Sequence, residues 1–289
     1  MIALATIGGL LAALFWGAGD YLIGKSGQQR DTYSTNLVNQ FVVVLALSGV
    51  ILWYRTPLVI EFNTLVIIIA SGIFFAIASL CFIKSLSIGP FGVAAPLSNS
   101  YALVTLLIGI FFLGFEASVL KIIALLVVIM GVVMLAVDRS TFDYKKLHGS
   151  TIYFATITMV CWGVAFAAVG LVSDKLPWYQ LLWLISIVIT FIGFLVYLFV
   201  HKKLPNWNNL GFRNMKIAWY AGILLALGST AFFVSVEQAQ DVVIPSVIAS
   251  AAPLGTSFLA YLYDGEKLSL YKRAGAVTIV LGLMLLNLF

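Results

Sequence analysis

The polar side chains in this sequence that could act on another molecule lie inside long apolar stretches. Two tryptophans, Trp16 and Trp162, precede glycines and could stack on or wall a small organic molecule. Amide and hydroxyl groups in similar stretches can donate and accept hydrogen bonds. The candidates of this second kind are Asn39, Gln40, Asn99, Tyr101 and Ser250. Together these seven residues form the candidate binding set for a small molecule.

Each candidate also has a structural interpretation that the sequence leaves open. A tryptophan can simply pack on a neighbour, while the glycine after it lets two helices approach closely. Asn99 can join two helices by a hydrogen bond worth about 1 kcal/mol. Ser250 can bond back to a carbonyl of its own helix, which is the commoner role for a helical serine.

Composition indicates where these residues lie. The chain has 289 residues, of which 62% are apolar and 9% charged, and its mean hydropathy is +1.10. Soluble domains carry about 25% charged residues, so the outer surface of this chain must face lipid. Apolar runs of about 20 residues, the length that crosses a bilayer, are expected at 2–23, 34–54, 64–86, 92–115, 119–138, 151–172, 179–200, 217–238, 242–263 and 270–289. The sequence therefore predicts an all-α integral membrane protein with ten transmembrane helices.

Charged residues near the expected helix ends are candidates for gating or coupling. Asp20 and Lys84 end the first and third apolar runs, which finish on the same side of the membrane. They predict an ion pair that closes that side, or an Asp20 carboxyl group that takes up a proton. The alternative is two independent side chains that extend their charges to the interface. Glu237 ends the eighth run, so the two halves are expected to have different gates.

Two prolines lie inside expected helices. Pro96 falls within 92–115 and Pro253 within 242–263. A proline removes a backbone hydrogen bond and frees a carbonyl group. We therefore predict kinks that bend during gating, although proline is also common in membrane helices without such a role.

The two halves of the chain repeat one another. Residues 70–85 align with 220–235 without a gap, so that Ser79 meets Ser229 and Phe82 meets Phe232 at a constant offset. Five helices per half is an odd number, so the second half must enter the membrane from the opposite side. The sequence predicts two inverted five-helix repeats, a signature of secondary transporters with a site near the membrane midplane between the halves. Their expected bounds are 1–138 and 151–289, joined by a linker at 139–150 within one membrane domain.

These features resemble the drug/metabolite transporter superfamily, in its EamA-type ten-helix branch. The matching elements are a Trp-Gly pair in the first helix of each half, a Gly-Glu element before the last helix of each half, and a glycine within that last helix. They stand at Trp16-Gly17, Trp162-Gly163, Gly114-Phe115-Glu116, Gly265-Glu266, Gly131 and Gly282, with Phe115 as an insertion in the first half. The resemblance implies a 5+5 repeat around a cavity lined mainly by helices 1, 3, 4, 6, 8 and 9. It also implies movement of small metabolites, without fixing the substrate.

The basic residues predict an orientation. Thirteen of the 16 Lys and Arg residues fall in or beside the loops that follow odd-numbered helices, and the others are Arg55, Lys121 and Lys175. Because basic loops stay in the cytoplasm, both termini are expected outside. This pattern suits a prokaryotic plasma (inner) membrane, and the net charge of +5 indicates orientation rather than nucleic-acid binding.

The expected function is secondary transport by alternating access, as an exporter or facilitator. Aromatic, amide and hydroxyl groups at depth suit small neutral, zwitterionic or aromatic metabolites such as amino acids, whereas phosphate esters would require Arg or Lys there. A membrane-embedded transferase would need a paired base and nucleophile, and no enzyme activity is expected. A channel and an uptake carrier for sugars or amines are further alternatives. No metal or cofactor is expected, because no His, Cys or carboxylate cluster has ligand spacing. The expected partners are a small-molecule metabolite and the lipid bilayer, with the protein a monomer or homodimer.

Overall fold

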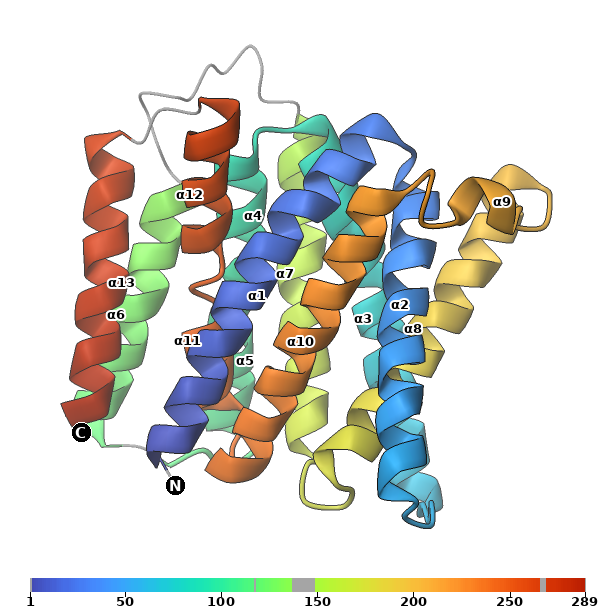
Figure 1. Cartoon of the computed structure of the whole chain (residues 1–289). Helices are drawn as coiled ribbons and strands as arrows, with labels where there is room; N and C mark the ends of the chain where they lie inside the picture. The colour runs from blue at the N-terminus through green and yellow to red at the C-terminus, as the bar shows by residue number, and fades with distance from the viewer. Residues whose placement is uncertain (1, 117, 137–148, 266–268, 289) are drawn as a thin grey trace.

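The computed structural model of the chain describes residues 2–116, 118–136, 149–265 and 269–288. All regular structure in these ranges is helical (Figure 1). The helices are α1 (Ile2–Gln29), α2 (Thr32–Tyr54), α3 (Phe62–Ile88), α4 (Phe91–Asn99), α5 (Tyr101–Phe112), α6 (Val119–Ala136), α7 (Gly149–Gly170), α8 (Trp178–His201), α9 (Trp207–Leu210), α10 (Lys216–Ala239), α11 (Val243–Ala249), α12 (Pro253–Asp264) and α13 (Leu270–Leu288).

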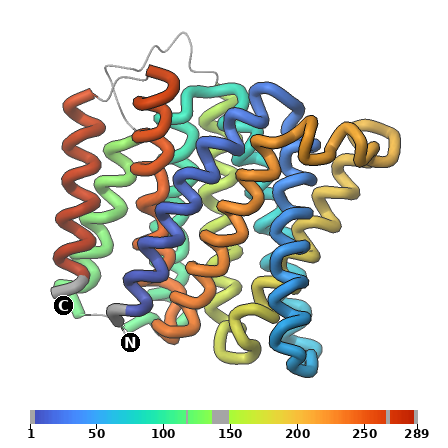
Figure 2. Tube along the Cα trace, in the orientation of Figure 1, coloured from blue at the N-terminus to red at the C-terminus, as the bar shows by residue number. Residues whose placement is uncertain are grey.

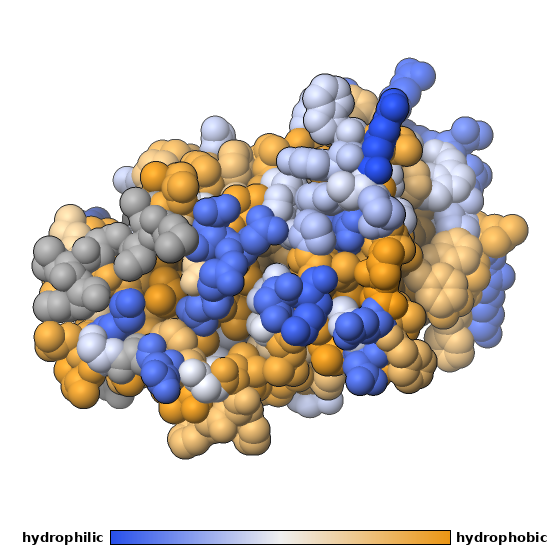
Figure 3. Space-filling view, turned by 90° about the horizontal axis from the view of Figure 1, so that it is seen from below, coloured by the Kyte–Doolittle hydropathy of each residue, from blue (hydrophilic) through white to orange (hydrophobic). Residues whose placement is uncertain are grey.

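The helices have the length and composition of membrane spans. Eight described segments meet both criteria when α4 is counted with α5 and α11 with α12. The two remaining expected segments correspond to α6, whose apolar part Val119–Leu135 is shorter, and to α13, which has 19 residues. Large apolar side chains such as Phe112 and Phe199 face outward, with 79% and 84% of their surface exposed. Figure 3 shows the lower face, where hydrophilic residues gather among hydrophobic ones. The predicted all-helical membrane class is confirmed.

The packing of the helices follows a two-fold relation between the halves. α1 packs along α10, and α7, the counterpart of α1, packs along α3, the counterpart of α10. α2 packs against its counterpart α8, and α6 against its counterpart α13. In Figure 1 α1 rises from the lower side, whereas α7 descends from the upper side, and both termini lie at the lower side in Figure 2. The halves are therefore inverted. Most of the expected linker, 139–150, lies outside the described residues.

The fourth and ninth expected helices are broken rather than continuous, which corrects the prediction. α4 ends at Asn99 and α5 begins at Tyr101, while α11 ends at Ala249 and α12 begins at Pro253. Proline lacks an N–H group and fits the first turn of a helix better than its interior. Pro253 therefore begins α12 instead of kinking a helix from inside. Pro96 does lie inside its helix, four residues before the break at Ser100.

The glycines after the two tryptophans bring helices into contact in both halves. A Cβ atom on Gly17 would lie 2.4 Å from the carbonyl oxygen of Ala252. A Cβ atom on Gly163 would lie 2.4 Å from the Cβ atom of Val104. Both distances are far below van der Waals contact, so only glycine fits. The close helix approach given above as the structural alternative for the Trp-Gly pairs is present in both halves.

A matched pair of hydrogen bonds reinforces these contacts. The Thr256 hydroxyl donates to the carbonyl oxygen of Gly17 at 3.0 Å, and the Thr105 hydroxyl donates to that of Gly163 at 3.3 Å. Each bond ties the first helix of one half to the helix after the break in the other half. The repeat seen in the sequence is thus also a repeat of interactions between the halves.

Candidate functional site

A cavity of about 100 Å³ lies in the middle of the bundle, between the two halves. Its lining comes from α1, α2, α3, the α4–α5 break, α7, α8 and α10. The resemblance implied lining by helices 1, 3, 4, 6, 8 and 9. The structure departs from this, because the second and seventh helices, α2 and α8, contribute and the ninth, α11 with α12, supplies no lining residue among those described. α2 and α8 pack against each other and so reach the centre.

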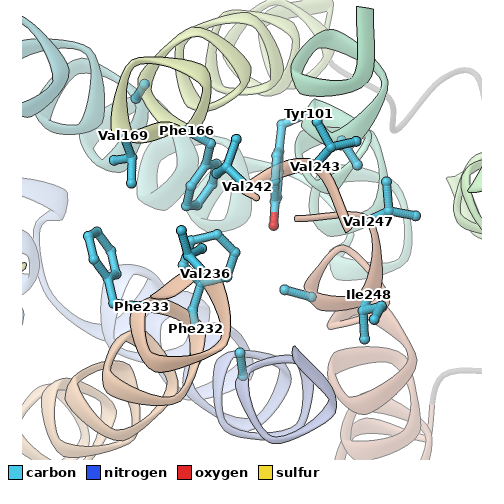
Figure 4. Packing of buried hydrophobic residues seen from close by; sticks show 14 of the residues in the cluster. Tyr101, Phe166, Val169, Phe232, Phe233, Val236, Val242, Val243, Val247 and Ile248 are labelled. Atoms are coloured by element: carbon cyan, nitrogen blue, oxygen red, sulfur yellow. The ribbon is translucent and has the colours of Figure 1, made fainter. Parts of the chain in front are cut away.

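Apolar side chains fill the space between this cavity and the lower side. Phe166, Phe232, Val236 and Val243 belong to one buried cluster, each with at most 4% of its surface exposed. Figure 4 shows them gathered between α7, α10 and the start of α11. Because Val236 lies near the lower end of α10 and Val243 begins α11, this cluster separates the cavity from the lower side.

The two predicted tryptophans both line the cavity. Trp16 packs on Phe232 with ring centroids 5.2 Å apart, and Trp162 packs on Phe82 at 4.7 Å. Phe82 and Phe232 are equivalent positions of the repeat, so the same aromatic contact occurs twice. Trp16 also donates from its indole nitrogen to the hydroxyl of Ser229, at 3.4 Å. The tryptophans therefore wall the cavity and pack on neighbours at the same time.

Asp20 provides the carboxyl group in the cavity. Of the described residues that line it, Asp20 alone is acidic, and none is Lys, Arg or His. Its side chain is 5% exposed, and the side chain of Asn99 is its hydrogen-bond partner. Tyr101 lines the cavity from the other side of the α4–α5 break and donates to the carbonyl oxygen of Ser246 at 3.4 Å. An aspartate, an asparagine and a tyrosine are thus among the residues that line the cavity.

The expected position of Asp20 at a helix end is wrong. α1 continues to Gln29, nine residues beyond Asp20, which places the carboxyl about 13 Å inside the helix end. Lys84 is half-buried on α3 and does not line the cavity. No ion pair among the described residues includes Asp20 or Lys84. The predicted ion pair between them is therefore absent, because the two groups lie at different depths.

A different ion pair lies at the upper side. Lys25 Nζ is 2.6 Å from Asp264 Oδ1, and the side chains are 27% and 21% exposed. The pair joins α1 of the first half to α12 of the second. The pair could not be predicted from local sequence pattern, because the two residues are far apart in the chain. The only available signal was that both lie near helix ends expected on the same side.

The Lys25–Asp264 pair is expected to make a small, specific contribution to stability. Partly exposed pairs contribute about 0.2–1 kcal/mol, so Lys25→Asp and Asp264→Lys should each lower the thermal unfolding temperature slightly. The double substitution should recover most of that loss. A double-mutant cycle on the detergent-purified protein measures the coupling. Additive losses in the double variant would show that the pair contributes nothing.

Asn39 has an unusual environment for a buried amide. Its side chain lines the cavity and is 1% exposed, yet neither Oδ1 nor Nδ2 has a hydrogen-bond partner among the described residues. A buried polar group left unpaired costs about 1–3 kcal/mol. Native proteins rarely tolerate this unless a water or ligand supplies the missing partner. The amide of Asn39 therefore keeps both its donor and its acceptor groups unpaired in the described cavity lining.

The neighbouring amides are already used within the protein. Gln40 Nε2 donates to Ser79 at 3.2 Å, and the Ser79 hydroxyl donates to Asn36 Oδ1 at 2.6 Å. Asn99 Nδ2 donates to the carbonyl oxygen of Ala95 at 3.0 Å. Gln40 and Asn99 line the cavity but are held by these bonds, which leaves Asn39 as the unpaired amide in the described lining.

Other predicted residues lie away from the cavity. Ser250 donates to the carbonyl oxygen of Val247 at 2.7 Å. This is the side-chain-to-backbone bond that was the alternative to a role in substrate binding. Glu237 accepts from the backbone N–H of Trp178 at 3.2 Å, at the start of α8. Pro96 and Pro253 lie near the helix breaks but do not line the cavity. Any gating role for Glu237 and the prolines stays a prediction.

Some lining residues were not predicted as binding residues. Ser79 and Ser229 both line the cavity and occupy equivalent positions of the repeat. Their coincidence in the gapless alignment was the signal that could have identified them. Phe82 lines the cavity too. Within the described part of the chain, no group of three His, Cys, Asp or Glu residues could hold a metal ion.

Comparisons with known proteins agree with this architecture. The model of the EamA-like transporter family matches residues 3–137 and again residues 149–288. An uncharacterized transporter of Archaeoglobus fulgidus is 25% identical over 288 residues, which cover 96% of each chain. An uncharacterized protein of Methanocaldococcus jannaschii is 26% identical over 135 residues, which are 98% of that protein and 47% of this chain. A solved crystal structure shares the fold with a TM-score of 0.74 at 17% identity, over 98% of this chain and 96% of that one.

Proposed function

Because the chain belongs to the EamA-like transporter family, we propose that this transporter carries small zwitterionic or aromatic metabolites, with amino acids first, through its central cavity. Transport would be secondary and would proceed by alternating access. Amines are the second candidate class, favoured by the single carboxyl group in the described lining.

The main support for this proposal is that the unpaired amide of Asn39 and the carboxyl of Asp20 line the same cavity. A carboxylate attracts an ammonium group, and aromatic walls such as Trp16 and Trp162 can stabilise a cation or stack on a ring. The Asn39 amide offers one acceptor and two donors, which suits the carboxylate or the neutral part of the same molecule.

The closures on the two sides support alternating access. The lower side would be closed by the apolar cluster of Phe166, Phe232, Val236 and Val243. The upper side would be held closed by the ion pair between Lys25 and Asp264. The broken helices provide short unwound segments, which many transporters use as hinges beside the substrate. In our proposal the first half and the second half rock against each other about the cavity.

Coupling and orientation are part of the same proposal. The Asp20 carboxyl could hold either a proton or a substrate ammonium, so the two would exchange across the membrane. Arg30, Lys203 and Arg213 lie in the upper loops, which supports a cytoplasmic upper side and outside termini. The proposed location is a prokaryotic plasma membrane, with the protein a monomer or homodimer.

The substitution Asn39→Leu tests the proposed binding role. It removes two unpaired buried polar atoms, so thermal stability should stay equal or rise by about 1 kcal/mol. At the same time, stabilisation by added amino acids should require at least about tenfold more ligand, because a lost hydrogen bond to a charged group is worth about 1.5–3 kcal/mol. Thermal unfolding with increasing amino acid concentration measures both quantities.

Asn36→Leu is the matched control, one turn away on α2. Asn36 accepts the 2.6 Å hydrogen bond from Ser79 and does not line the cavity. This variant should lose stability. An Asn39→Leu protein that loses stability but keeps the full amino acid response would refute the binding role.

A further inference from the structure

A second hollow, of about 480 Å³, lies at the upper side, outside the central cavity. It is bounded by the end of α1, the start of α2, the end of α8 and the segment around α9. Residues that matter for its chemistry are Arg30, Asp31, Tyr197, His201, Lys203 and Asn214. None of them lines the central cavity, so the proposed transport function leaves this hollow unexplained.

Two cationic side chains in this hollow are not neutralised by an ion pair. Arg30 donates from Nη2 to the backbone oxygen of Asn214 at 3.2 Å, which leaves the other N–H groups of its guanidinium available. Lys203 is exposed, and neither cation takes part in an ion pair among the described residues. A guanidinium fork and an ammonium group that line the same hollow are well suited to phosphate oxygens.

The acidic residue of the hollow, Asp31, already has hydrogen-bond partners within the protein. Asp31 Oδ1 accepts from the backbone N–H of Ser34 at 2.8 Å and lies 3.2 Å from His201 Nε2. Burial alone would raise the pKa of Asp31, but the hydrogen bonds from Ser34 and His201 hold this pKa below its ordinary value. Asp31 therefore remains an anion paired locally, and the Arg30 and Lys203 charges leave the hollow with an excess of positive charge.

The hollow lies at the level expected for lipid headgroups. α1 ends at Gln29, α2 begins at Thr32 and α8 ends at His201, so its walls are the ends of membrane spans. Figure 1 shows α9 at the upper edge of the bundle, beyond α2 and α8. The segment around α9 exposes Leu204 and Trp207, at 73% and 47%. Exposed Trp at a span end is typical of the membrane interface.

We propose that this hollow binds the phosphate headgroup of an anionic phospholipid. Arg30 and Lys203 hold the phosphate, while Leu204 and Trp207 lie against the lipid beside it. The adjoining apolar side chains favour a lipid over a free phosphate ion, which would gain nothing from them. Basic hollows between the ends of membrane helices suit anionic headgroups for the same electrostatic reason.

The test uses the full-length protein purified in neutral detergent. Its thermal unfolding is followed while short-chain phosphatidylglycerol, phosphatidylcholine of the same chain length or inorganic phosphate is added. Phosphatidylglycerol should raise the unfolding temperature by mass action. The variant Arg30→Gln/Lys203→Gln should need about twenty-fivefold more of this lipid, at about fivefold for each basic residue removed.

Arg213→Gln/Lys216→Gln is the matched control, since both side chains are exposed on the same side and do not line the hollow. It should respond as the unaltered protein does. If the first double variant fails to fold, Lys203→Gln alone should show the fivefold loss. An equal response to phosphatidylcholine, an equal response to inorganic phosphate, or an unchanged response in the lysine variant would each overturn the proposal.

Discussion

Replacing Asp20 with asparagine is expected to lower the transport of a zwitterionic or amine metabolite at least about tenfold. Asparagine keeps the size of the side chain but removes the charge of the cavity lining, and a charged hydrogen bond is worth about 1.5–3 kcal/mol. The fold should persist, because a neutral amide is easier to bury than a carboxylate. Tracer flux into proteoliposomes, measured beside thermal unfolding, separates the loss of transport from a loss of folding.

Asp264→Asn is the control for the Asp20 substitution. It makes the same chemical change in the ion pair with Lys25 at the upper side, outside the cavity lining. Its flux should stay within a few-fold of the unaltered protein, because partly exposed pairs contribute little. If the Asp20→Asn protein kept full flux, Asp20 would take part in neither substrate binding nor proton coupling.

Replacing Gly17 with alanine is expected to destabilise the protein by about 1–3 kcal/mol. The added Cβ atom would meet the Ala252 carbonyl oxygen at 2.4 Å, and the backbone of Gly255 at 3.1 Å leaves it no room to move aside. α1 must then separate from α12, which also weakens the hydrogen bond from Thr256. Thermal unfolding of the purified protein should show a clear decrease.

The substitution Gly49→Ala is expected to have the opposite effect on stability. Nothing lies within 4 Å of a Cβ atom built on Gly49, which is within α2. Alanine should therefore stabilise this helix by up to about 1 kcal/mol. If Gly17→Ala were as harmless as Gly49→Ala, the close contact between α1 and α12 would be wrong.

The sequence predicted the features that depend on local pattern and on repetition. Apolar runs of span length predicted the helical membrane class, because lipid leaves the backbone few other choices. The gapless alignment of Ser79 with Ser229 and Phe82 with Phe232 predicted the repeat. The structure adds that both phenylalanines meet a tryptophan of the opposite half, at 4.7 and 5.2 Å.

Features that depend on packing between distant helices could not be predicted. Hydropathy ended the first helix at residue 23, but α1 continues to Gln29 and includes Lys25, which pairs with Asp264 of the other half. The error placed Asp20 at an interface rather than in the cavity. Similarly, helix spacing alone could not show which of the neighbouring amides on α2 lacks a hydrogen-bond partner. Gln40 donates to Ser79, whereas Asn39 has no partner among the described residues.

The most direct test of the account is a thermal-unfolding screen of the purified protein against amino acids, amines, sugars, nucleosides and phosphate esters. A ligand of the folded state stabilises it by about 2.7 kcal/mol at a hundredfold excess over its dissociation constant. We predict shifts confined to compounds that carry an ammonium group, and the loss of these shifts in the Asp20→Asn protein. Shifts caused by sugars, phosphate-ester shifts that persist in the Arg30→Gln/Lys203→Gln protein, or amino acid shifts that persist in the Asp20→Asn protein would contradict it.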